Sequence, residues 1–332
     1  MNLDEKYMHR ALQLAALGNG SVSPNPMVGA VIVHNGKIIG EGYHRQIGHA
    51  HAEVNAVNSV AECDQDKFKE STIYVTLEPC SHYGKTPPCS KLLIEKGIKR
   101  VVVGCLDPFK EVSGRGIKML KDAGCEVVTG VLEKECKAMN KKFMTAHTLQ
   151  RPYILLKWAE SIDGFIDKKR EGDAKAAVIS TPVTSVFVHK LRAEYDAIMV
   201  GGNTAILDNP SLTTRLWHGR NPKRFVVWRN QPIDKSLRLF NDGQETEVIN
   251  TKDKPLPEIM HEIYQKGITS IIIEGGAKLL QSFLEIGLFD EVHVEIGNKV
   301  FHDGTKAPVL PQNLRLTTEE NFGYHRILTY EP

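Results

Sequence analysis

The chain carries four residues, His51, Glu53, Cys80 and Cys89, whose types and order suit a catalytic zinc site. An imidazole and two thiolates are ligands that zinc prefers, and catalytic sites use three protein ligands and keep a fourth position for water. Glu53 is then free to take a proton from that water and deliver it to leaving ammonia. The H-x-E…P-C arrangement is typical of zinc-dependent deaminases that act on nucleobase-like rings.

Each part of this pattern also has a purely structural explanation. A histidine two residues before a glutamate is common, and two cysteines nine positions apart can be ordinary buried thiols. The joint pattern is much rarer and favours the catalytic zinc site. Eight residues, 81–88, separate the cysteines, so a wider loop is expected beside the metal than in the C-x-x-C nucleic-acid deaminases. His82 in this loop is predicted to contact the substrate in preference to the metal.

The elements predicted around these residues can bring them together. Apolar residues recur at helical spacing over 52–60, so His51 and Glu53 open a helix and can reach one point beyond its start. Cys80 follows a strand-like run at 72–76, and Cys89 follows two prolines and precedes a helical run at 91–96. The start of that helix and the metal both favour a thiolate at Cys89.

The rest of the first half predicts an α/β domain. Strands alternate with helices, and a valine run at 101–103 is typical of a strand buried on both faces. We therefore expect a three-layer sandwich with a mixed sheet. The remaining predicted helices span 4–17, 116–123 and 133–148, and the remaining predicted strands span 29–34, 37–42, 100–105 and 126–130.

A proline after a long helical run marks a domain boundary at 148–152. We expect a first domain over 1–148 and a second, also α/β, over 151–332. Residues 229–257 are polar and weakly patterned, and no function is assigned to them. The strands of the second domain are predicted at 153–158, 197–200, 225–227, 270–273 and 292–296, and its helices at 182–194, 257–266 and 277–286.

Glycine turns follow two strands of the second domain. Gly275 and Gly276 follow Glu274 between a buried strand and a helix, where glycines let a backbone approach a phosphate at the helix start. A plain tight turn explains this pair equally well, and 201–204 is a second turn of the same kind. The loop 208–215 holds an acid and a base, but its spacing alone indicates only a capped turn. The Rossmann G-x-G-x-x-G fingerprint is absent from this half of the sequence.

Composition excludes several classes of protein. The 332 residues are 41% hydrophobic and 25% charged, and they contain no apolar run of the roughly 18 residues that a transmembrane helix needs. The N-terminus lacks the apolar core of a signal peptide, so we expect a cytoplasmic protein. A net charge of +2 argues against DNA or long RNA as a partner, though not against a small phosphorylated substrate. Six cysteines in a chain of this length do not predict a disulfide framework.

Longer motifs add a family resemblance that spacing alone cannot supply. Over nearly its full length the chain resembles the bifunctional deaminase/reductase family of riboflavin biosynthesis. The string P-C-S-H-Y-G-K-T-P-P-C at 79–89 is highly specific for that family. The other motifs that carry the resemblance are S-P-N-P-M-V-G-A at 23–30, G-H-A-H-A-E at 48–53, D-P at 107–108, S-G-R-G-I at 113–117, K-x-A-x-S-x-D-G at 157–164, D-N-P-x-L-T-x-R at 208–215 and E-G-G at 274–276.

The resemblance implies two folds and two reactions. The first domain is expected to be similar to cytidine deaminase and to use one Zn²⁺ per chain. It would hydrolyse an amino group from 2,5-diamino-6-(5-phosphoribosylamino)pyrimidin-4-one. The second domain is expected to be similar in fold to dihydrofolate reductase and to use NADPH to reduce the ribosyl group to ribityl. A homo-oligomer without nucleic-acid or membrane partners is also expected.

The resemblance assigns further site residues by matching position. Two arginines on the substrate side suit a sugar phosphate, and a lysine in the zinc loop offers a point charge. The deaminase pocket would include Asn25, His44, His82, Lys85 and Asp107. Cofactor-side positions are Lys157, Ala159, Ser161, Asp163, Thr204, Asp208, Gly275 and Gly276. Substrate-side positions of the reductase are Arg192, Leu212, Arg215 and Glu274.

The chain departs from the family pattern at a few positions. Val178 stands where the family usually has a tryptophan, Trp228 where an aspartate is usual, and Phe109 where asparagine is common. The first departure supports a rival hypothesis, in which the second domain has lost reduction and serves as a scaffold. A tRNA-base deaminase is a second rival, which the near-neutral charge disfavours. A non-catalytic zinc module is a third, which conflicts with an unligated Glu53 beside only three good ligands.

Overall fold

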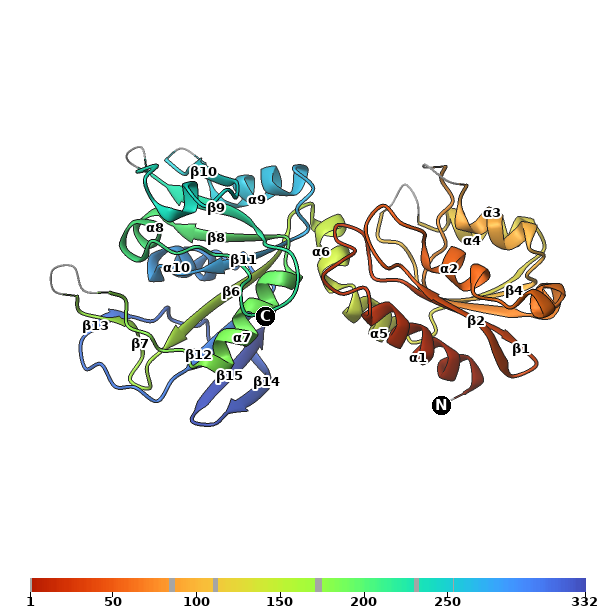
Figure 1. Cartoon of the computed structure of the whole chain (residues 1–332), viewed down its shortest axis with the longest axis horizontal. Helices are drawn as coiled ribbons and strands as arrows, with labels where there is room; N and C mark the ends of the chain where they lie inside the picture. Colours follow the sequence, from red (N-terminus) through yellow and green to blue (C-terminus); the bar gives the residue numbers. More distant parts are fainter. Residues whose placement is uncertain (1, 84–86, 110–112, 171–174, 230–232, 253) are drawn as a thin grey trace. The chain divides into compact units, whose positions relative to one another are not determined.

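The computed structural model describes residues 2–83, 87–109, 113–170, 175–229, 233–252 and 254–332 (Figure 1). The chain divides into two compact units, Met1–Leu149 and Gln150–Pro332. Among the described residues, no helix is both long and apolar enough to cross a membrane.

The first unit is built on one five-stranded mixed sheet in the order β2-β1-β3-β4-β5. Strand β1 runs antiparallel to β2 and β3, and β3, β4 and β5 run parallel to one another. The middle strands are apolar on both faces, as Val101, Val102 and Val103 illustrate, because helices cover both sides. The strands are β1 (Gly29–His34), β2 (Lys37–Tyr43), β3 (Thr72–Leu77), β4 (Arg100–Cys105) and β5 (Glu126–Thr129).

Two hydrophobic cores lie on the two faces of this sheet. One packs α2, α3 and α4 against the strands, and the other packs α1 and α5 against the opposite face (Figure 1). The expected three-layer sandwich with a mixed sheet is confirmed. The helices are α1 (Leu3–Ala16), α2 (Ala52–Asn58), the 3-10 helix η1 (Glu62–Glu70), α3 (Cys89–Glu95), α4 (Arg115–Asp122), α5 (Glu133–Met139) and α6 (Lys141–Leu149).

The single helix predicted over 133–148 is two helices in the structure, α5 and α6, separated at Asn140. The Asn140 side chain donates to the carbonyl oxygen of Met27 at 2.9 Å and accepts from the Met27 N–H at 2.8 Å. These two bonds hold a distant loop, so the break follows from tertiary contacts that helical periodicity cannot reveal.

The second unit is built on an eight-stranded sheet in the order β10-β9-β8-β11-β6-β12-β15-β14. The six strands from β10 to β12 are parallel, and β15 and β14 complete the sheet with antiparallel pairs. The strands are β6 (Tyr153–Glu160), β8 (Ala197–Gly201), β9 (Lys223–Trp228), β10 (Thr246–Asn250), β11 (Ser270–Glu274), β12 (Glu291–Ile296), β14 (Arg315–Phe322) and β15 (His325–Glu331), with β7 (Phe165–Lys168) and β13 (Gly304–Lys306) as a separate pair.

Helices cover both faces of the second sheet (Figure 1). One core contains Met260 and Phe283 from α9 and α10, and the other contains Leu191 from α7. The carboxyl ends of β8, β11, β6 and β12 meet at one edge, because these strands are parallel and adjacent. The helices are α7 (Pro182–Glu194), α8 (Gly202–Asp208), the 3-10 helix η2 (Arg238–Phe240), α9 (Leu256–Gln265) and α10 (Ala277–Glu285).

Candidate functional site

His51, Cys80 and Cys89 form a compact cluster of metal-binding side chains. One donor atom from each residue lies within 4.8 Å of the others. The Nδ1 of His51 is 3.7 Å from the Sγ of Cys80 and 3.4 Å from the Sγ of Cys89. The sequence predicted this group from residues 38 positions apart.

The geometry of the cluster fits zinc. Bond lengths of about 2.3 Å to sulfur and 2.0–2.1 Å to nitrogen at a tetrahedral angle put a sulfur and a nitrogen ligand roughly 3.6 Å apart. The two sulfur–nitrogen separations, 3.7 and 3.4 Å, lie on either side of that value. His51 is exposed while Cys89 is buried, so the cluster has one side open towards solvent. Three ligands with an accessible fourth position are typical of a catalytic rather than a structural zinc site.

Three element ends hold these ligands. His51 is the N-cap residue of α2, and Cys89 is the first residue of α3. Cys80 follows β3, and its carbonyl oxygen accepts bonds from the backbone N–H of Ser90 at 3.2 Å and from the Ser90 hydroxyl at 2.7 Å. The loop before α3 is thereby tied back to the strand end, which places both cysteines beside the histidine.

Glu78, a residue that the sequence reasoning missed, anchors the next loop. Its buried carboxylate accepts backbone N–H bonds from Gly114 and Gly116, each at 2.9 Å. Gly116 approaches so closely that a Cβ there would lie 2.0 Å from the carbonyl oxygen of Pro79. The motif at 113–117 is therefore explained by packing against the strand end that carries Cys80. A buried glutamate preceding Pro79-Cys80 was the available signal, but its partners lie more than thirty positions away.

Hydrogen bonds favour the thiolate form of Cys80. The pKa of the Cys80 thiol is lowered to about 4. A hydrogen bond from Cys89 is the largest cause, and a hydrogen bond from His51 also contributes. The backbone N–H of Cys89 also donates to this sulfur at 3.2 Å. Because a thiolate is the form that binds metal, Cys80 is prepared for ligation at neutral pH.

Glu53 lies in the first turn of α2 beside the cluster and is buried. In the protein alone, burial and then the nearby Cys80 thiolate raise the pKa of Glu53 to about 7. The charge of a bound cation would act in the opposite direction. A buried carboxylate beside the three ligands suits a group that both accepts and returns a proton.

Asn25 and His44 form a pair next to the cluster. The Nδ2 of Asn25 lies 3.1 Å from the Nε2 of His44, and the Nδ1 of His44 lies 3.1 Å from the carbonyl oxygen of Ala50. The carbonyl can only accept, so Nδ1 carries the proton and Nε2 accepts from Asn25. The rings of His44 and His51 meet edge to face with centroids 5.6 Å apart. Burial lowers the pKa of His44, which keeps this ring neutral.

Of the other three expected deaminase residues, the structure describes His82 and Asp107. His82 is exposed in the loop after Cys80, and Asp107 is half-buried after β4. The Asp107 carboxylate accepts the backbone N–H of Phe109 at 2.9 Å, which shapes its own turn. Lys85 lies outside the described residues.

In the second unit, Arg192 and Glu274 form a nearly buried ion pair with a 2.7 Å bond. Their side chains are each 12% exposed. The Nε of Arg192 and the Oε1 of Glu274 are buried and have no hydrogen-bond partner among the described residues. Buried polar atoms usually have partners, so this pair retains capacity for a ligand.

Arg215 lies close to that pair. Its backbone N–H donates to the Nδ1 of His189 at 2.8 Å, and its side chain donates to Thr213 at 2.6 Å. Burial, followed by the positive charges of Arg192 and Arg215, lowers the pKa of His189 to about 4. Leu212 is buried with a left-handed φ of 52°, so it fixes the shape of this loop. These residues bring two guanidinium groups to one region, as an anionic substrate requires.

The predicted phosphate turn has a suitable backbone. Gly275 and Gly276 adopt φ values of 75° and 79°, and Gly276 is the N-cap residue of α10. A Cβ at Gly276 would lie 3.1 Å from the hydroxyl of Thr204, so the glycines leave a bare backbone facing α8. A left-handed turn at the start of a helix suits phosphate binding. Lys157 and Ala159 lie on β6, which pairs with β11 through Lys157 and Glu274.

Two acidic residues expected near the cofactor have protein partners. The Asp163 carboxylate accepts the Ser161 hydroxyl at 2.6 Å and the backbone N–H groups of Phe301 at 3.1 Å and His302 at 2.7 Å. Asp208 pairs with Arg170 at 2.5 Å. We infer that Asp163 acts on the site by holding the loop after β12. No local pattern predicts this contact, which spans 139 positions.

Comparisons with known proteins match a different family model to each unit. Residues 1–105 match the model of the cytidine and deoxycytidylate deaminase zinc-binding region, and residues 152–322 match the model of the RibD C-terminal domain. The chain is 38% identical to riboflavin biosynthesis protein RibD of Aquifex aeolicus, covering 91% of this chain and 89% of the relative. It is 34% identical to the Escherichia coli protein of the same name, covering 98% and 96%.

Solved structures are similar over the whole chain. A diaminohydroxyphosphoribosylaminopyrimidine deaminase/5-amino-6-(5-phosphoribosylamino)uracil reductase from Thermotoga maritima superimposes with a TM-score of 0.89 at 35% identity, covering 99% of both chains. RibD from Acinetobacter baumannii superimposes with a TM-score of 0.89 at 30% identity, again covering 99% of both chains.

Proposed function

This chain belongs to the RibD family of bifunctional riboflavin-biosynthesis proteins, and from that membership we propose which substrate each unit handles and which residues act on it. The family combines a zinc-dependent deaminase with an NADPH-dependent reductase, and this chain has both units. The proposed substrate of the first unit is 2,5-diamino-6-(5-phosphoribosylamino)pyrimidin-4-one. The second unit then reduces the ribosyl group of the deaminated product to ribityl.

The observation that carries the deaminase assignment is the His51, Cys80 and Cys89 cluster with Glu53 beside it. These three residues would hold zinc, which when bound activates a water molecule as a nucleophile near neutral pH. Glu53 accepts a proton from the attacking water and returns it to the departing amino group. Its burial keeps bulk water away from the proton during this transfer.

Asn25 is proposed to bind the edge of the pyrimidine ring. His44 accepts one hydrogen of the Asn25 amide, so the amide orientation is set and its oxygen is left to contact the substrate. His82 and Asp107 are proposed as further contacts from the loops after β3 and β4. Lys85 is proposed to offer a point charge to the substrate in the same pocket.

In the reductase, the turn at Gly275 and Gly276 is proposed to hold a phosphate of NADPH, with Thr204 beside it. When bound, the cofactor supplies the hydride. Arg192 and Arg215 are proposed to bind the sugar phosphate, since Arg192 retains an unpartnered buried Nε. Glu274 and Leu212 complete the substrate side. Lys157, Ala159, Ser161, Asp163 and Asp208 complete the cofactor side, the last two by shaping loops.

The remaining proposals concern partners and location. The substrate is a small phosphorylated molecule, and a net charge of +2 supports the absence of a nucleic-acid partner. Free thiols at all six cysteines support a reducing compartment such as the cytoplasm. Self-association into a homo-oligomer is tested by light scattering during size-exclusion chromatography.

The overall assignment is tested by incubating the purified chain with the diaminopyrimidine, with and without NADPH. Without NADPH the deaminated ribosyl compound should accumulate, and with NADPH its ribityl derivative should appear, as resolved by mass. Deamination without any reduction would favour the scaffold role for the second unit. Deamination of a tRNA base but not of the pyrimidine would favour the rival nucleic-acid function.

A further inference from the structure

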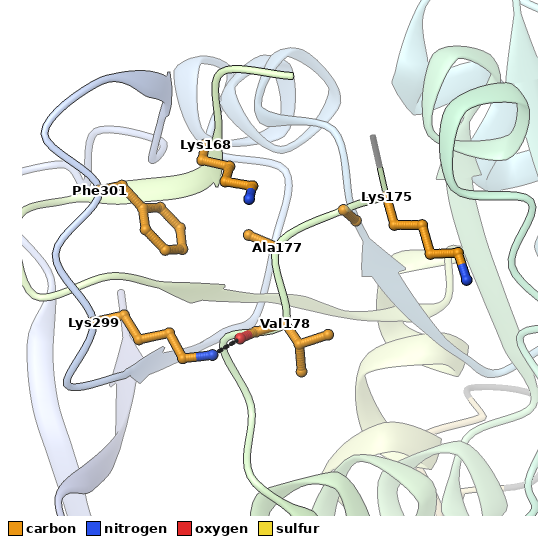
Figure 2. Close-up of a pocket in the computed structure, with 7 residues that line it drawn as sticks. Lys168, Lys175, Ala177, Val178, Lys299 and Phe301 are labelled. Carbon is orange, nitrogen blue, oxygen red and sulfur yellow. Dashed lines mark hydrogen bonds between the residues drawn. The ribbon is translucent and has the colours of Figure 1, made fainter. Parts of the chain in front are cut away.

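Two loops at the reductase site are each anchored by a charged side chain from elsewhere in the second unit. Figure 2 shows one of them, the loop after β12, whose residues form one wall of a pocket. Asp163 anchors that loop by accepting backbone N–H groups. The other loop, 208–215, is called the substrate-side loop because it carries Leu212 and Arg215. Its anchor is Arg224 on β9, a residue without a role so far.

Arg224 is fully buried, and its guanidinium group donates to a carboxylate and to main-chain carbonyl oxygens. Its Nη1 donates to the carbonyl oxygen of Ser211 at 2.9 Å and to the Asp242 carboxylate at 2.6 Å. Its Nη2 donates to the other oxygen of that carboxylate and to the carbonyl oxygen of Leu239, each at 2.8 Å. The carbonyl oxygen of Gln244 is a further acceptor for Nη2. One cation therefore takes its acceptors from two separate parts of the chain.

These acceptors belong to the substrate-side loop and to the segment 233–244, which lies in a stretch without an assigned function. The loop and the segment are joined at further points. The side-chain oxygen of Asn209 accepts the backbone N–H of Arg238 at 2.7 Å. Leu212 and Leu239 are buried in the same hydrophobic core. The connection thus combines hydrogen bonds, an ion pair and apolar packing.

The charge of Arg224 makes this connection depend on both segments. A buried guanidinium is unfavourable unless a counter-charge and acceptors surround it. A hydrogen bond from Arg224 is the largest cause that lowers the pKa of Asp242, so this carboxylate stays ionised as the counter-charge. If either segment moved away, buried donors would lose their partners, which is costly. The substrate-side loop and the segment 233–244 therefore hold each other in place.

The segment 233–244 also comes close to Arg215. The pKa of Arg215 is lowered by burial and then by the positive charges of Arg192 and Arg238. Arg238 belongs to η2 within the segment. A displacement of the segment would therefore change both the shape of the substrate-side loop and the charge beside Arg215.

We propose that Arg224 and Asp242 are positioning residues for the reduction. They hold the segment 233–244 against the substrate-side loop and thereby set the place of Leu212. They act through this loop and not by contact with substrate or cofactor. This role rests on the reductase function proposed above, and it gives a function to part of the stretch 229–257.

The test uses the full chain and the variants Arg224→Lys, Asp242→Asn and Asn209→Ala. The first keeps the charge but loses the fork of donors, and the second keeps the shape but loses the counter-charge. The third breaks a separate hydrogen bond of the same connection, so it serves if a change at the buried pair prevents folding. Asp234→Asn is the control, because Asp234 lies in the same segment but its carboxylate accepts bonds from Ser236.

Reduction of the deaminated pyrimidine, followed by the loss of NADPH absorbance, gives kcat and both KM values. Each of the three variants should raise KM for the pyrimidine by about three- to tenfold, the scale of one net hydrogen bond. KM for NADPH should stay within about twofold, because the turn at Gly275 and Gly276 lies on another loop. A KM does not depend on the fraction of folded protein, whereas a loss of stability lowers the apparent kcat alone.

Hydrogen exchange, followed by mass spectrometry of the chain without ligands, examines the loop directly. Amides of the substrate-side loop and of the segment 233–244 should exchange faster in the three variants than in the wild type or in Asp234→Asn. Exchange at the wild-type rate would overturn the proposal, and so would a fall in kcat at an unchanged KM for the pyrimidine. If the wild-type chain reduces nothing, the reductase function fails by itself. Hydrogen exchange then still decides whether Arg224 holds the loop.

Discussion

The backbone N–H of Cys89 donates a hydrogen bond to the Sγ of Cys80, 3.2 Å away. The first residue of α3 therefore supports the thiolate that follows β3, and the cysteines depend on each other as well as on His51. A substitution of the Cys89 side chain keeps this N–H, so its effect on the metal reports the loss of the Cys89 thiolate.

The three-ligand set gives the first prediction. Cys89→Ala should lose the zinc, whereas the wild-type chain should hold about one zinc per chain, as a single three-ligand site does. Metal content measured by mass spectrometry after gel filtration checks this. Cys63→Ala is the matched control, because Cys63 is an exposed free thiol outside the cluster. Full zinc retention by Cys89→Ala would exclude Cys89 as a ligand.

The second prediction separates the two reactions. Glu53→Gln should keep the zinc and the fold but slow deamination by at least about a hundredfold, because the proton-transferring group is gone. Reduction of pre-deaminated substrate should be unchanged. Glu62→Gln, on the exposed 3-10 helix η1, is the control. Parallel loss of both activities would show that the two sites are not independent.

The third prediction distinguishes the substrate and cofactor sides of the reductase. Arg215→Ala should lower kcat/KM for the phosphorylated substrate by about ten- to a hundredfold, the effect of losing a charge-assisted contact. It should leave NADPH affinity nearly unchanged. Arg326→Ala is the control, because Arg326 is an exposed arginine that pairs with Glu319 on the edge strands.

Gly276→Ala should do the reverse. Its φ of 79° strains any side chain, and the new Cβ would lie 3.1 Å from the Thr204 hydroxyl. NADPH affinity should fall by about tenfold or more, consistent with strain of roughly 1–3 kcal/mol. Steady-state kinetics with both substrates varied would reveal swapped roles if Arg215→Ala affects the cofactor and Gly276→Ala the sugar phosphate.

The fourth prediction concerns Asp163. Asp163→Asn should weaken the bonds to Phe301 and His302, in the loop that it shapes on the cofactor side, and raise KM for NADPH several-fold with little change in KM for the pyrimidine, as expected for weakened hydrogen bonds worth about 1 kcal/mol. Asp303→Asn, at an exposed aspartate on the same loop, is the control. A selective loss of pyrimidine affinity would instead mean that the loop held by Asp163 belongs to the substrate side.

The fifth prediction is a pH dependence of stability. The pKa of His189 is 6.5 in the unfolded chain and about 4 in the fold. Burial is the largest cause of this decrease, and the positive charges of the neighbouring arginines are the second. Between these values the unfolded chain takes up a proton that the folded chain does not. The stability of the second unit should therefore fall as pH drops below 6.5, by roughly 1–2 kcal/mol at pH 5 once solvent screening is allowed for.

Tryptophan fluorescence can isolate this effect, since all three tryptophans, Trp158, Trp217 and Trp228, belong to the second unit. Urea unfolding at pH 7.5 and 5 should show a smaller decline for His189→Gln than for the wild type. The exposed His218→Gln should behave as the wild type does. Equal declines in all three proteins would remove His189 as the cause.

The amino-acid sequence best predicted those elements whose pattern lies in neighbouring residues. The strand at 100–105 and the helix at 182–194 match β4 and α7, because apolar periodicity and capping are encoded in neighbouring residues. The His51, Cys80 and Cys89 cluster was also predictable, since metal chemistry restricts residue types more tightly than packing does.

Sequence predicted least where the structure depends on distant partners. Strand β10 lies in the segment left unassigned, and β14 was missed, because an exposed edge strand carries little apolar alternation. Strand β15, an interior and mostly buried strand, was missed as well. The buried Glu295 was missed too. It accepts bonds from Ser180 and Thr184 at 2.6 and 2.7 Å and thereby fixes the start of α7 across 111 positions or more.

The loop carrying Phe301 is fastened to Asp163 by peptide N–H groups and not by its own side chains. Every non-proline residue supplies the same N–H, so the fastening does not depend on the side chain of Phe301, whereas the left-handed φ of 62° restricts the residue type at His302. The side chains at 299–301 can therefore be varied while Asp163 keeps the backbone of the loop in place.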